Sequence, residues 1–392
     1  MRGSVYVHFP YCLAKCPYCD FVSYKAAPAA IDHEGYADAV LRELEARRAP
    51  FLAALAAKGG EPRIGSIFFG GGTPSLWEPR SLGRVLAALR RTLPATGDVE
   101  VTVECNPTSL DEARARMLQG EGVNRLSIGT QSLDADELRF LGRLHDPDGA
   151  LRAIEGALRV ADLRVSADLI FGLHGQPADA APKQAARLCE LGLSHVSAYQ
   201  LTIEAGTQFG ELARRGRLPL ADDGRVAEAF LALDEAMTAR GFRHYEISNY
   251  ARPGQEARHN LGYWRGEPYL GLGCAAFGAY GGARRRNPTD PARYVAFTRE
   301  LADAGASADD ELVEPLDGAT LLRERIMLGL RLECGFDLEE AANAVGEVAW
   351  TDERRRAADW LAARERLNVR GNHLAIPRHA WLFADDTAAR LF

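Results

Sequence analysis

The sequence contains no long hydrophobic run. None of its apolar stretches approaches the ~18 consecutive residues that a membrane-spanning helix requires, so we expect no transmembrane segment. The amino terminus reads MRGSVYVHFPYC and shows neither an apolar signal core nor a small-residue cleavage site. We therefore also expect no signal peptide.

The sequence lacks an excess of positive charge. The formal net charge is −7, whereas proteins that bind nucleic acid normally present a basic face to the phosphates. The run Arg284-Arg285-Arg286 could form a small anion site, although a solvated surface is the simpler interpretation. We expect no nucleic-acid partner.

Cysteines are few and odd in number. Seven cysteines in a chain without an expected export signal argue against a disulfide framework. The sequence therefore predicts a cytoplasmic protein in a reducing compartment, where thiolates are available to bind metal. Cys105, Cys189 and Cys334 are interpreted as structural, and the role of Cys274 stays open.

The first half of the chain repeats a β-rich run, a loop and a helical stretch. Several β-rich runs are almost continuously apolar, as strands buried on both faces are. The predicted strands are Ser4–Phe9, Ser66–Phe69, Glu100–Glu104, Arg125–Ile128, Arg164–Ile170 and His195–Leu201. The predicted helices include Glu34–Ala57, Arg80–Leu93, Leu110–Gln119 and Ala178–Leu191.

This alternation predicts an α/β fold with parallel strands and right-handed crossovers. Six units are too few for the eight of a closed barrel, so we expect an open, partial six-unit (β/α) barrel. A flat doubly wound sheet is the alternative architecture.

The pattern changes after about residue 215. A long helix is predicted over Asp222–Arg240 and a strand over Arg243–Ile247, followed by a stretch rich in glycine and aromatic residues. Further predicted elements are the helices Thr320–Leu330, Leu338–Val345 and Val348–Leu367 and a strand pair around Val369 and Leu374–Ile376. We expect a barrel over 1–215, a connecting region over 216–310 and a winged-helix-like carboxy-terminal domain over 311–392.

A cysteine triplet directly follows the first predicted strand. Cys12, Cys16 and Cys19 have the spacing C-x3-C-x2-C, and no fourth Cys or His stands where a structural zinc site would need one. Three thiolates fit a four-iron cluster that leaves one iron free for an outside ligand. Three ordinary buried cysteines are the alternative, but three cysteines within eight residues of a proline-containing loop are hard to explain as side chains of a hydrophobic core. The triplet therefore predicts a [4Fe–4S] cluster.

Together with its flanks, YVHFPYCLAKCPYCDF, this triplet resembles the radical S-adenosylmethionine (radical-SAM) superfamily, and the resemblance covers most of the chain. Within that superfamily the run is similar to the branch of oxygen-independent coproporphyrinogen III dehydrogenase, and above all to the haem chaperone group called HemW. The resemblance implies that S-adenosylmethionine (SAM) binds the free iron. An electron passed to its sulfonium would break a C–S bond and leave a 5′-deoxyadenosyl radical.

The resemblance also implies SAM contacts at the ends of successive strands. Glycines in the run FFGGGTPS let the backbone approach a ligand closely. The implied SAM-binding residues are Tyr6, Tyr18, Gly71, Gly72, Thr73, Glu104, Gln131, Arg143 and Asp168. A carboxylate such as Asp168 is costly inside an apolar strand without a partner, so a structural ion pair with Arg143 is the alternative for these two. No side chain is assigned as catalytic.

A second motif, HNxxYW, is implied by the resemblance to contribute to haem binding. Its residues are His259, Asn260, Tyr263 and Trp264. Histidine is a common axial ligand of haem iron, and Tyr and Trp offer broad faces to a porphyrin. A hydrogen-bonded structural histidine is the alternative, and the axial ligand stays open.

Two departures separate the sequence from the dehydrogenase. Phe21 stands where the dehydrogenase has a further cysteine, and the first strand begins at Ser4, without the dehydrogenase's amino-terminal extension. The resemblance therefore implies a haem chaperone with an electron donor and with haem-accepting proteins as partners, a membrane-bound haem enzyme being one candidate acceptor. Oxidation of coproporphyrinogen III is the enzyme alternative. Radical modification of RNA is disfavoured by the net charge.

Overall fold

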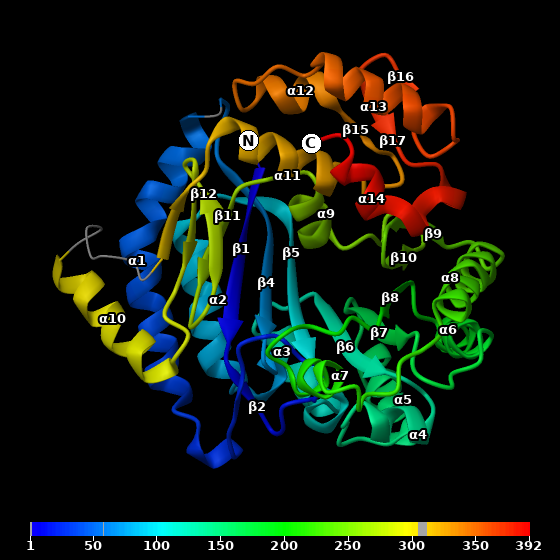
Figure 1. The fold of residues 1–392 in the computed structure, drawn as a ribbon. Coiled ribbons are helices and arrows are strands. Elements are labelled where there is room, and N and C mark those ends of the chain that lie inside the picture. The colour runs from blue at the N-terminus through cyan, green and yellow to red at the C-terminus, as the bar shows by residue number, and fades with distance from the viewer. Residues whose placement is uncertain (1, 58, 305–311) are drawn as a thin grey trace.

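A single large curved sheet organises the molecule (Figure 1). The computed structural model describes residues 2–57, 59–304 and 312–392. In this described part the sheet has 12 strands in the order β14-β13-β12-β11-β1-β4-β5-β6-β7-β8-β10-β9.

Six parallel strands form the centre of the sheet, and each coincides with one of the predicted strands to within a few residues; the last ends at Gln200, one residue before the predicted end at Leu201. They are β1 (Arg2–Phe9), β4 (Arg63–Gly71), β5 (Ala95–Cys105), β6 (Arg125–Gln131), β7 (Arg164–Phe171) and β8 (His195–Gln200). Their spatial order follows the chain order, so crossovers of one hand place every connecting helix on the same face. In a doubly wound sheet, the order of the strands would reverse within the sheet. The partial barrel is therefore confirmed, and the doubly wound alternative is wrong.

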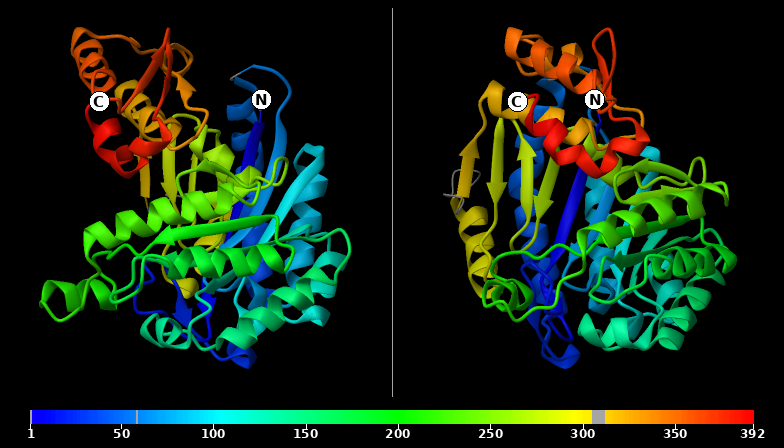
Figure 2. Two further views of the ribbon diagram at one scale, coloured as in Figure 1. Left: turned by 90° about the vertical axis from the view of Figure 1, so that its right-hand side faces the viewer. Right: turned by 45° about the vertical axis from the view of Figure 1, so that its right-hand side comes forward.

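Helices cover the outer face of this sheet (Figures 1 and 2). They are α1 (His33–Ala57), α2 (Pro79–Thr92), α3 (Glu112–Gly120), α4 (Ala135–Phe140), α5 (Pro147–Leu158), α6 (Ala180–Glu190) and α8 (Asp223–Thr238). Several begin at an aspartate whose side chain accepts a backbone N–H of the first turn, as Asp111 and Asp146 do. None of the helices in the described part combines the length and apolarity that a membrane crossing requires.

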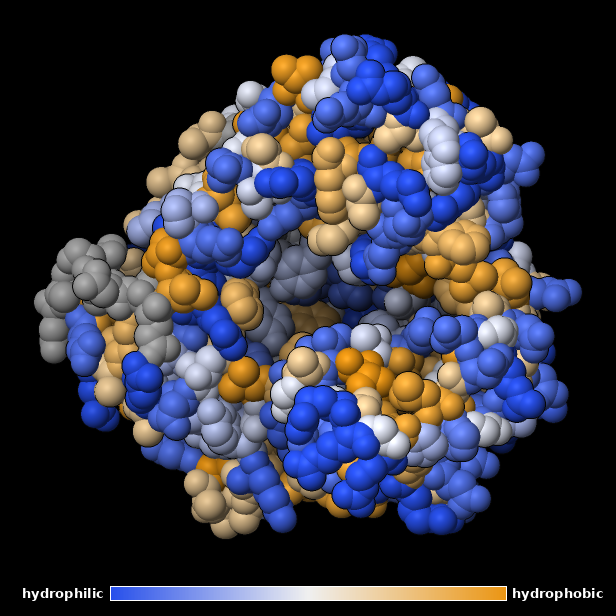
Figure 3. Space-filling model, viewed as in Figure 1, coloured by the Kyte–Doolittle hydropathy of each residue, from blue (hydrophilic) through white to orange (hydrophobic). Residues whose placement is uncertain are grey.

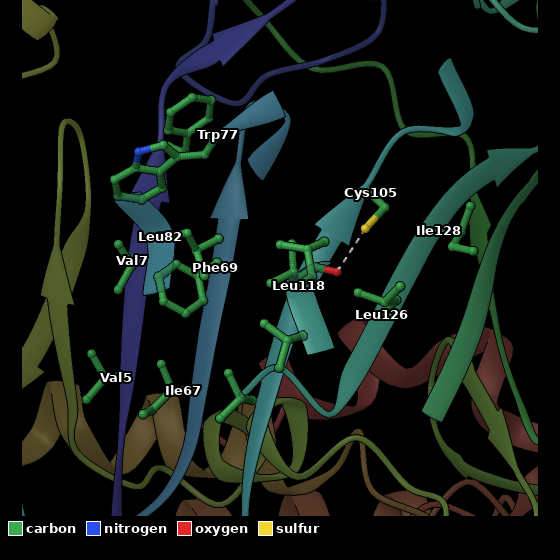
Figure 4. Close-up of a cluster of buried hydrophobic side chains, with 14 of the residues drawn as sticks. Val5, Val7, Ile67, Phe69, Trp77, Leu82, Cys105, Leu118, Leu126 and Ile128 are labelled. Carbon is green, nitrogen blue, oxygen red and sulfur yellow. Dashed lines mark hydrogen bonds between the residues drawn. The ribbon is translucent and has the colours of Figure 1, made fainter. Parts of the chain in front are cut away.

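The two faces of the central strands differ in polarity. Outward side chains such as Val7, Ile67 and Phe69 are buried under the helices together with Trp77 (Figure 4). The alternate residues face the concave side, where hydrogen bonds join polar groups such as Ser127 and Asp168. The apolar runs had suggested strands buried on both faces, but the concave face is polar and can receive a ligand.

Further strands extend both edges of the barrel. β11 (Tyr269–Leu272) pairs with β1, and the antiparallel strands β12 (Phe277–Tyr280), β13 (Ala283–Arg286) and β14 (Leu312–Pro315) follow it outward. On the other edge lie β10 (Asn249–Ala251) and β9 (Arg243–Glu246). The boundary expected at residue 215 stays a prediction, and the one expected at 310 lies outside the described residues.

The carboxy-terminal part packs around a core of its own. Its elements are α11 (Gly318–Gly329), β15 (Phe336–Asp337), α12 (Leu338–Asn343), α13 (Asp352–Ala362), β16 (Asn368–Arg370), β17 (His373–Ala375) and α14 (Ala384–Ala389). The strands form a small sheet in the order β15-β17-β16, and Leu338, Leu361 and Leu374 are buried beside it. This helix, strand, helix, helix and hairpin order is the winged-helix-like arrangement expected from the sequence.

Candidate functional site

The cysteine triplet lies in a loop at the carboxyl end of β1. Two short strands, β2 (Tyr11–Cys12) and β3 (Tyr24–Lys25), pair with each other and close the loop. His8 holds the end of this loop in place through a hydrogen bond, because the His8 Nε2 lies 2.8 Å from the carbonyl oxygen of Val22. A carbonyl only accepts, so Nε2 carries the proton and Nδ1 accepts from the Tyr6 hydroxyl at 3.0 Å. Burial lowers the pKa of His8 to about 4, so the ring is neutral.

All three cysteines line one cavity of about 480 Å³. Burial raises the pKa of Cys12 and raises that of Cys19 to about 11. The Thr73 hydroxyl opposes this effect at Cys12, because it donates to the Cys12 Sγ at 3.3 Å. The Arg143 Nη1 donates to the Cys16 Sγ at 3.4 Å. Both contacts stabilise the thiolate form that binds metal.

The sulfurs fit a cluster better than a single ion. In the described part of the chain, no three His, Cys, Asp or Glu side chains converge as ligands of one metal ion. A four-iron cluster does not need such convergence, because each thiolate binds a different iron. Three thiols around a cavity of this size therefore fit a [4Fe–4S] cluster.

The Gly-rich run after β4 lies directly against the cysteine loop. The Gly72 N–H donates to the carbonyl of Phe9, and the Thr73 N–H donates to that of Tyr11, both at 2.8 Å. A Cβ on Gly72 would stand 2.7 Å from the Tyr11 oxygen. Gly71 has a φ of 105°, and a Cβ there would meet the His8 ring at 2.4 Å. Only glycine lets the two segments approach this closely.

Two carboxyl groups face the cavity from neighbouring strand ends. Burial, together with the nearby Asp168, raises the pKa of Glu104 to about 8, and Glu104 accepts the Gly71 N–H at 3.1 Å. Burial also raises the pKa of Asp168, which accepts from the Ser127 hydroxyl at 3.2 Å. These carboxyl groups lack a cationic partner among the described ion pairs, so the cavity suits a ligand with positive charge.

Arg143 and Gln131 complete the far wall. The Arg143 Nη2 donates to the Gly129 carbonyl at 2.8 Å, so its described bonds go to this oxygen and to Cys16, not to Asp168. Gln131 has a φ of 66° after an irregularity in the β6–β7 register. A positive φ is unfavourable for a residue with a side chain, and such strain is common at functional sites.

The cavity thus collects most of the predicted cofactor residues. Its lining includes Cys12, Cys16, Tyr18, Cys19, Gly71, Gly72, Thr73, Glu104, Gln131, Arg143 and Asp168. Tyr6 does not line it but packs behind Gly70, where a Cβ would meet the Tyr6 ring at 2.9 Å. The sequence reasoning missed several residues that also line the cavity, namely Ser127, Tyr199, Gln200, Leu201, Thr202 and Glu204. Alternation along β6 and β8 could have identified the first two.

The HNxxYW motif lies outside this cavity, on α9 (Arg258–Trp264) near the amino ends of the strands (Figure 1). His259 is 1% exposed, and its ring stacks on Phe68 with 4.8 Å between centroids. Its Nδ1 lies 3.0 Å from the Ser66 hydroxyl and its Nε2 lies 3.0 Å from the Tyr263 hydroxyl. The histidine is hydrogen-bonded at both nitrogens here, and Cys274 is also fully buried. A role of the motif in haem binding stays a prediction.

Comparison with known proteins identifies the family. Residues 6–184 match the Radical SAM superfamily, and residues 316–383 match the HemN C-terminal domain. The heme chaperone HemW of Mycobacterium tuberculosis is 34% identical over 389 residues, which are 99% of this chain and 94% of that protein. HemW of Escherichia coli is 40% identical over 275 residues, 70% of this chain and 69% of that protein.

Relatives also occur outside bacteria. The mitochondrial radical S-adenosyl methionine domain-containing protein 1 of Danio rerio is 36% identical over 341 residues, 86% of this chain and 74% of that protein. Among solved structures, coproporphyrinogen III oxidase (HemN) of Escherichia coli has a TM-score of 0.79 at 18% identity and covers 99% of this chain and 89% of its own. That likeness shows the fold. The sequence matches show that the chain belongs to the radical SAM superfamily and, within it, to the HemW group.

Proposed function

We propose that this protein binds haem and delivers it to haem-accepting proteins, using a radical-SAM centre built on Cys12, Cys16 and Cys19. The match to a heme chaperone over 389 residues is the observation that carries this proposal. Phe21 supports it, because the place of the dehydrogenase's further cysteine holds an exposed phenylalanine. We place the protein in the cytoplasm, with a separate electron donor.

Different residues of the cavity would hold the cluster and SAM. The three thiolates hold the cluster, and Thr73 and Arg143 stabilise them through the contacts already described. When bound, the cluster would supply one electron to the sulfonium of SAM. Glu104 and Asp168 would meet the positively charged amino group of SAM, which favours their ionised form.

The HNxxYW helix would help to hold haem through its aromatic side chains. Coordination of iron by His259 would first require its bonds to Ser66 and Tyr263 to break. We therefore assign His259 to the support of α9, and Tyr263 and Trp264 to contact with the macrocycle. Tyr263 already packs edge-on against Tyr269, with 4.8 Å between ring centroids, on the concave side of the sheet.

A haem titration tests the proposed function. Protein purified and reconstituted without oxygen is titrated with haem while the Soret band is followed, and the same preparation is incubated with coproporphyrinogen III, SAM and a reductant. We expect stoichiometric haem binding and no conversion of coproporphyrinogen III. Conversion together with weak haem binding would overturn the proposal in favour of the oxidase alternative.

Matched tryptophan variants test the motif. Trp264→Ala is compared with Trp360→Ala, which removes a partly exposed tryptophan from α13 in the carboxy-terminal part. We expect only Trp264→Ala to weaken haem binding. Equal affinities of the two variants would remove Trp264 from the proposed haem contacts.

A further inference from the structure

The strands beyond β1 form one wall of the hollow on the concave side of the sheet, which the space-filling view shows at the centre of the molecule (Figure 3). In β11, Leu270 and Leu272 are buried in the core under the helices, so Tyr269 faces the concave side. Tyr269 pairs with Ala279, and the next alternate residue of β12 is Phe277. Phe277 therefore faces the hollow.

The pairing of β12 with β13 and of β13 with β14 shows which residues of these strands lie on the same face as Phe277. Phe277 pairs with Arg286 on β13, and Arg286 pairs with Leu312 on β14. Directly paired residues project from the same face of a sheet, so these three side chains stand in one row. Phe277 is 40% exposed and Leu312 is 50% exposed, so two large apolar side chains are open to solvent here.

Arg286 lies between these apolar groups, and no carboxylate of the described residues pairs with it. Its guanidinium carbon is 5.0 Å from the centre of the Phe277 ring. Its Nε is buried without a hydrogen-bond partner, and no ion pair involves Arg286 in the part of the chain that the structure describes. An arginine held in this way presents its remaining N–H groups to an incoming anion.

The other two arginines of the run have different surroundings. Arg284 pairs with Glu314 and Glu324. Arg285 lies on the opposite face, with its guanidinium 4.5 Å from the Tyr280 ring, and Tyr280 packs against Phe51 of α1. The sequence suggested one solvated basic patch, but the strand separates the three charges and leaves Arg286 facing the hollow.

We propose that the row Phe277–Arg286–Leu312 is a seat for haem, in which the macrocycle lies against Phe277 and Leu312 and a propionate binds Arg286. This inference rests on the proposed function and adds the place and orientation of the ligand. Haem combines a flat apolar ring with two carboxylates, and the row combines an open apolar surface with one guanidinium that no described carboxylate neutralises. The cavity across the hollow carries the acidic side chains of Glu104 and Asp168 and suits a positively charged group, so the propionates are better placed at Arg286.

Arg286→Gln and Arg285→Gln form a matched pair on opposite faces of one strand. The probes are haem and haem dimethyl ester, in which both propionates are blocked. We expect Arg286→Gln to raise the dissociation constant for haem about tenfold or more, as loss of a charge-assisted hydrogen bond does. The dimethyl ester should bind Arg286→Gln and the unchanged protein alike, Arg285→Gln should bind haem normally, and Arg286→Lys should recover part of the affinity.

Phe277→Ala tests the apolar half of the seat. This variant should bind haem and its dimethyl ester more weakly by similar factors, because both ligands share the macrocycle. Equal melting temperatures and an unchanged cluster absorption band are required of every variant, so that a folding defect is recognised. Haem bound equally well by Arg286→Gln and Arg285→Gln would overturn this inference but leave the proposed function intact. Absence of haem binding by the unchanged protein would overturn both.

Discussion

Glu104 is a buried carboxyl group whose protonation is linked to stability. Its pKa is about 8 in the folded protein because of burial and the nearby Asp168, whereas the ordinary value is near 4.5. Between these two pH values the folded protein retains a proton that the unfolded chain has released. Stability therefore falls as the pH rises from about 4.5 to about 8.

Glu104→Gln should remove this loss of stability. We expect the cofactor-free variant to be more stable than the unchanged protein at pH 8, on the order of a few kcal/mol, and similar to it near pH 5. Urea unfolding at the two pH values measures the difference. Glu228→Gln, which removes an exposed glutamate of α8, is the control. If the stability of the variant relative to the unchanged protein were no greater at pH 8 than at pH 5, the buried, protonated state of Glu104 would be contradicted.

Arg143 should tune the reduction potential of the proposed cluster. Its Nη1 donates to the Cys16 Sγ, and a positive charge beside a ligand sulfur stabilises the reduced cluster. Arg143→Met should therefore lower the potential by on the order of 50 mV, measured by redox titration followed by electron paramagnetic resonance. Arg139→Met, which removes an exposed arginine of α4, should leave it unchanged. Equal potentials in both variants would remove Arg143 from this role.

At the scale of elements, α9 is held to the barrel by His259. Burial lowers the pKa of His259 to about 3, so the ring is neutral in the fold but takes up a proton in the unfolded chain below about pH 6.5. His259 therefore contributes to the loss of stability as the pH falls from about 6.5 to 3. His259→Ala should cost about 2–4 kcal/mol through the loss of two hydrogen bonds and the stack on Phe68.

Chemical unfolding at pH 7.5 with Tyr263→Phe beside His259→Ala measures this contribution. Tyr263→Phe removes only the hydroxyl next to the His259 Nε2 and should cost about 1 kcal/mol. A negligible loss of stability in His259→Ala would contradict the supporting role and return the histidine to the candidate iron ligands.

The elements also show what a sequence can reveal. The six barrel strands were predictable because each is a short local β-rich run followed by a loop, and the cysteine triplet was predictable from its spacing. The pairing of β1 with β11 joins Ser4 to Tyr269. No local sequence pattern indicates a contact between residues that lie so far apart in the sequence. The wall that carries Phe277 and Arg286 was therefore invisible in the sequence.

At the scale of the whole molecule, two separate cores are joined by backbone hydrogen bonds and by ion pairs such as Arg243–Glu333 and Asp234–Arg378. The Ile247 N–H donates to the Arg331 carbonyl, and the Glu333 N–H donates to that of Tyr245. Leu338 is fully buried in the carboxy-terminal core, so Leu338→Ala should cost about 2–5 kcal/mol there. We expect faster amide hydrogen exchange over residues 318–391 and little change in the central strands.

Leu126→Ala, which alters the core of the large sheet, is the matched control. It should accelerate exchange in the central strands. If Leu338→Ala accelerated exchange in both parts equally, the two cores would be one cooperative unit, and the separate carboxy-terminal domain would be contradicted.

We propose that haem is the cargo of this radical-SAM protein and not its substrate. Reconstituted, haem-loaded protein is incubated without oxygen with SAM and a reductant, and the tetrapyrrole is then extracted and analysed by mass spectrometry. We predict that the haem is recovered with its mass unchanged, whether or not SAM is cleaved. A tetrapyrrole of altered mass, formed in proportion to 5′-deoxyadenosine, would contradict the account and make the protein an enzyme that acts on haem.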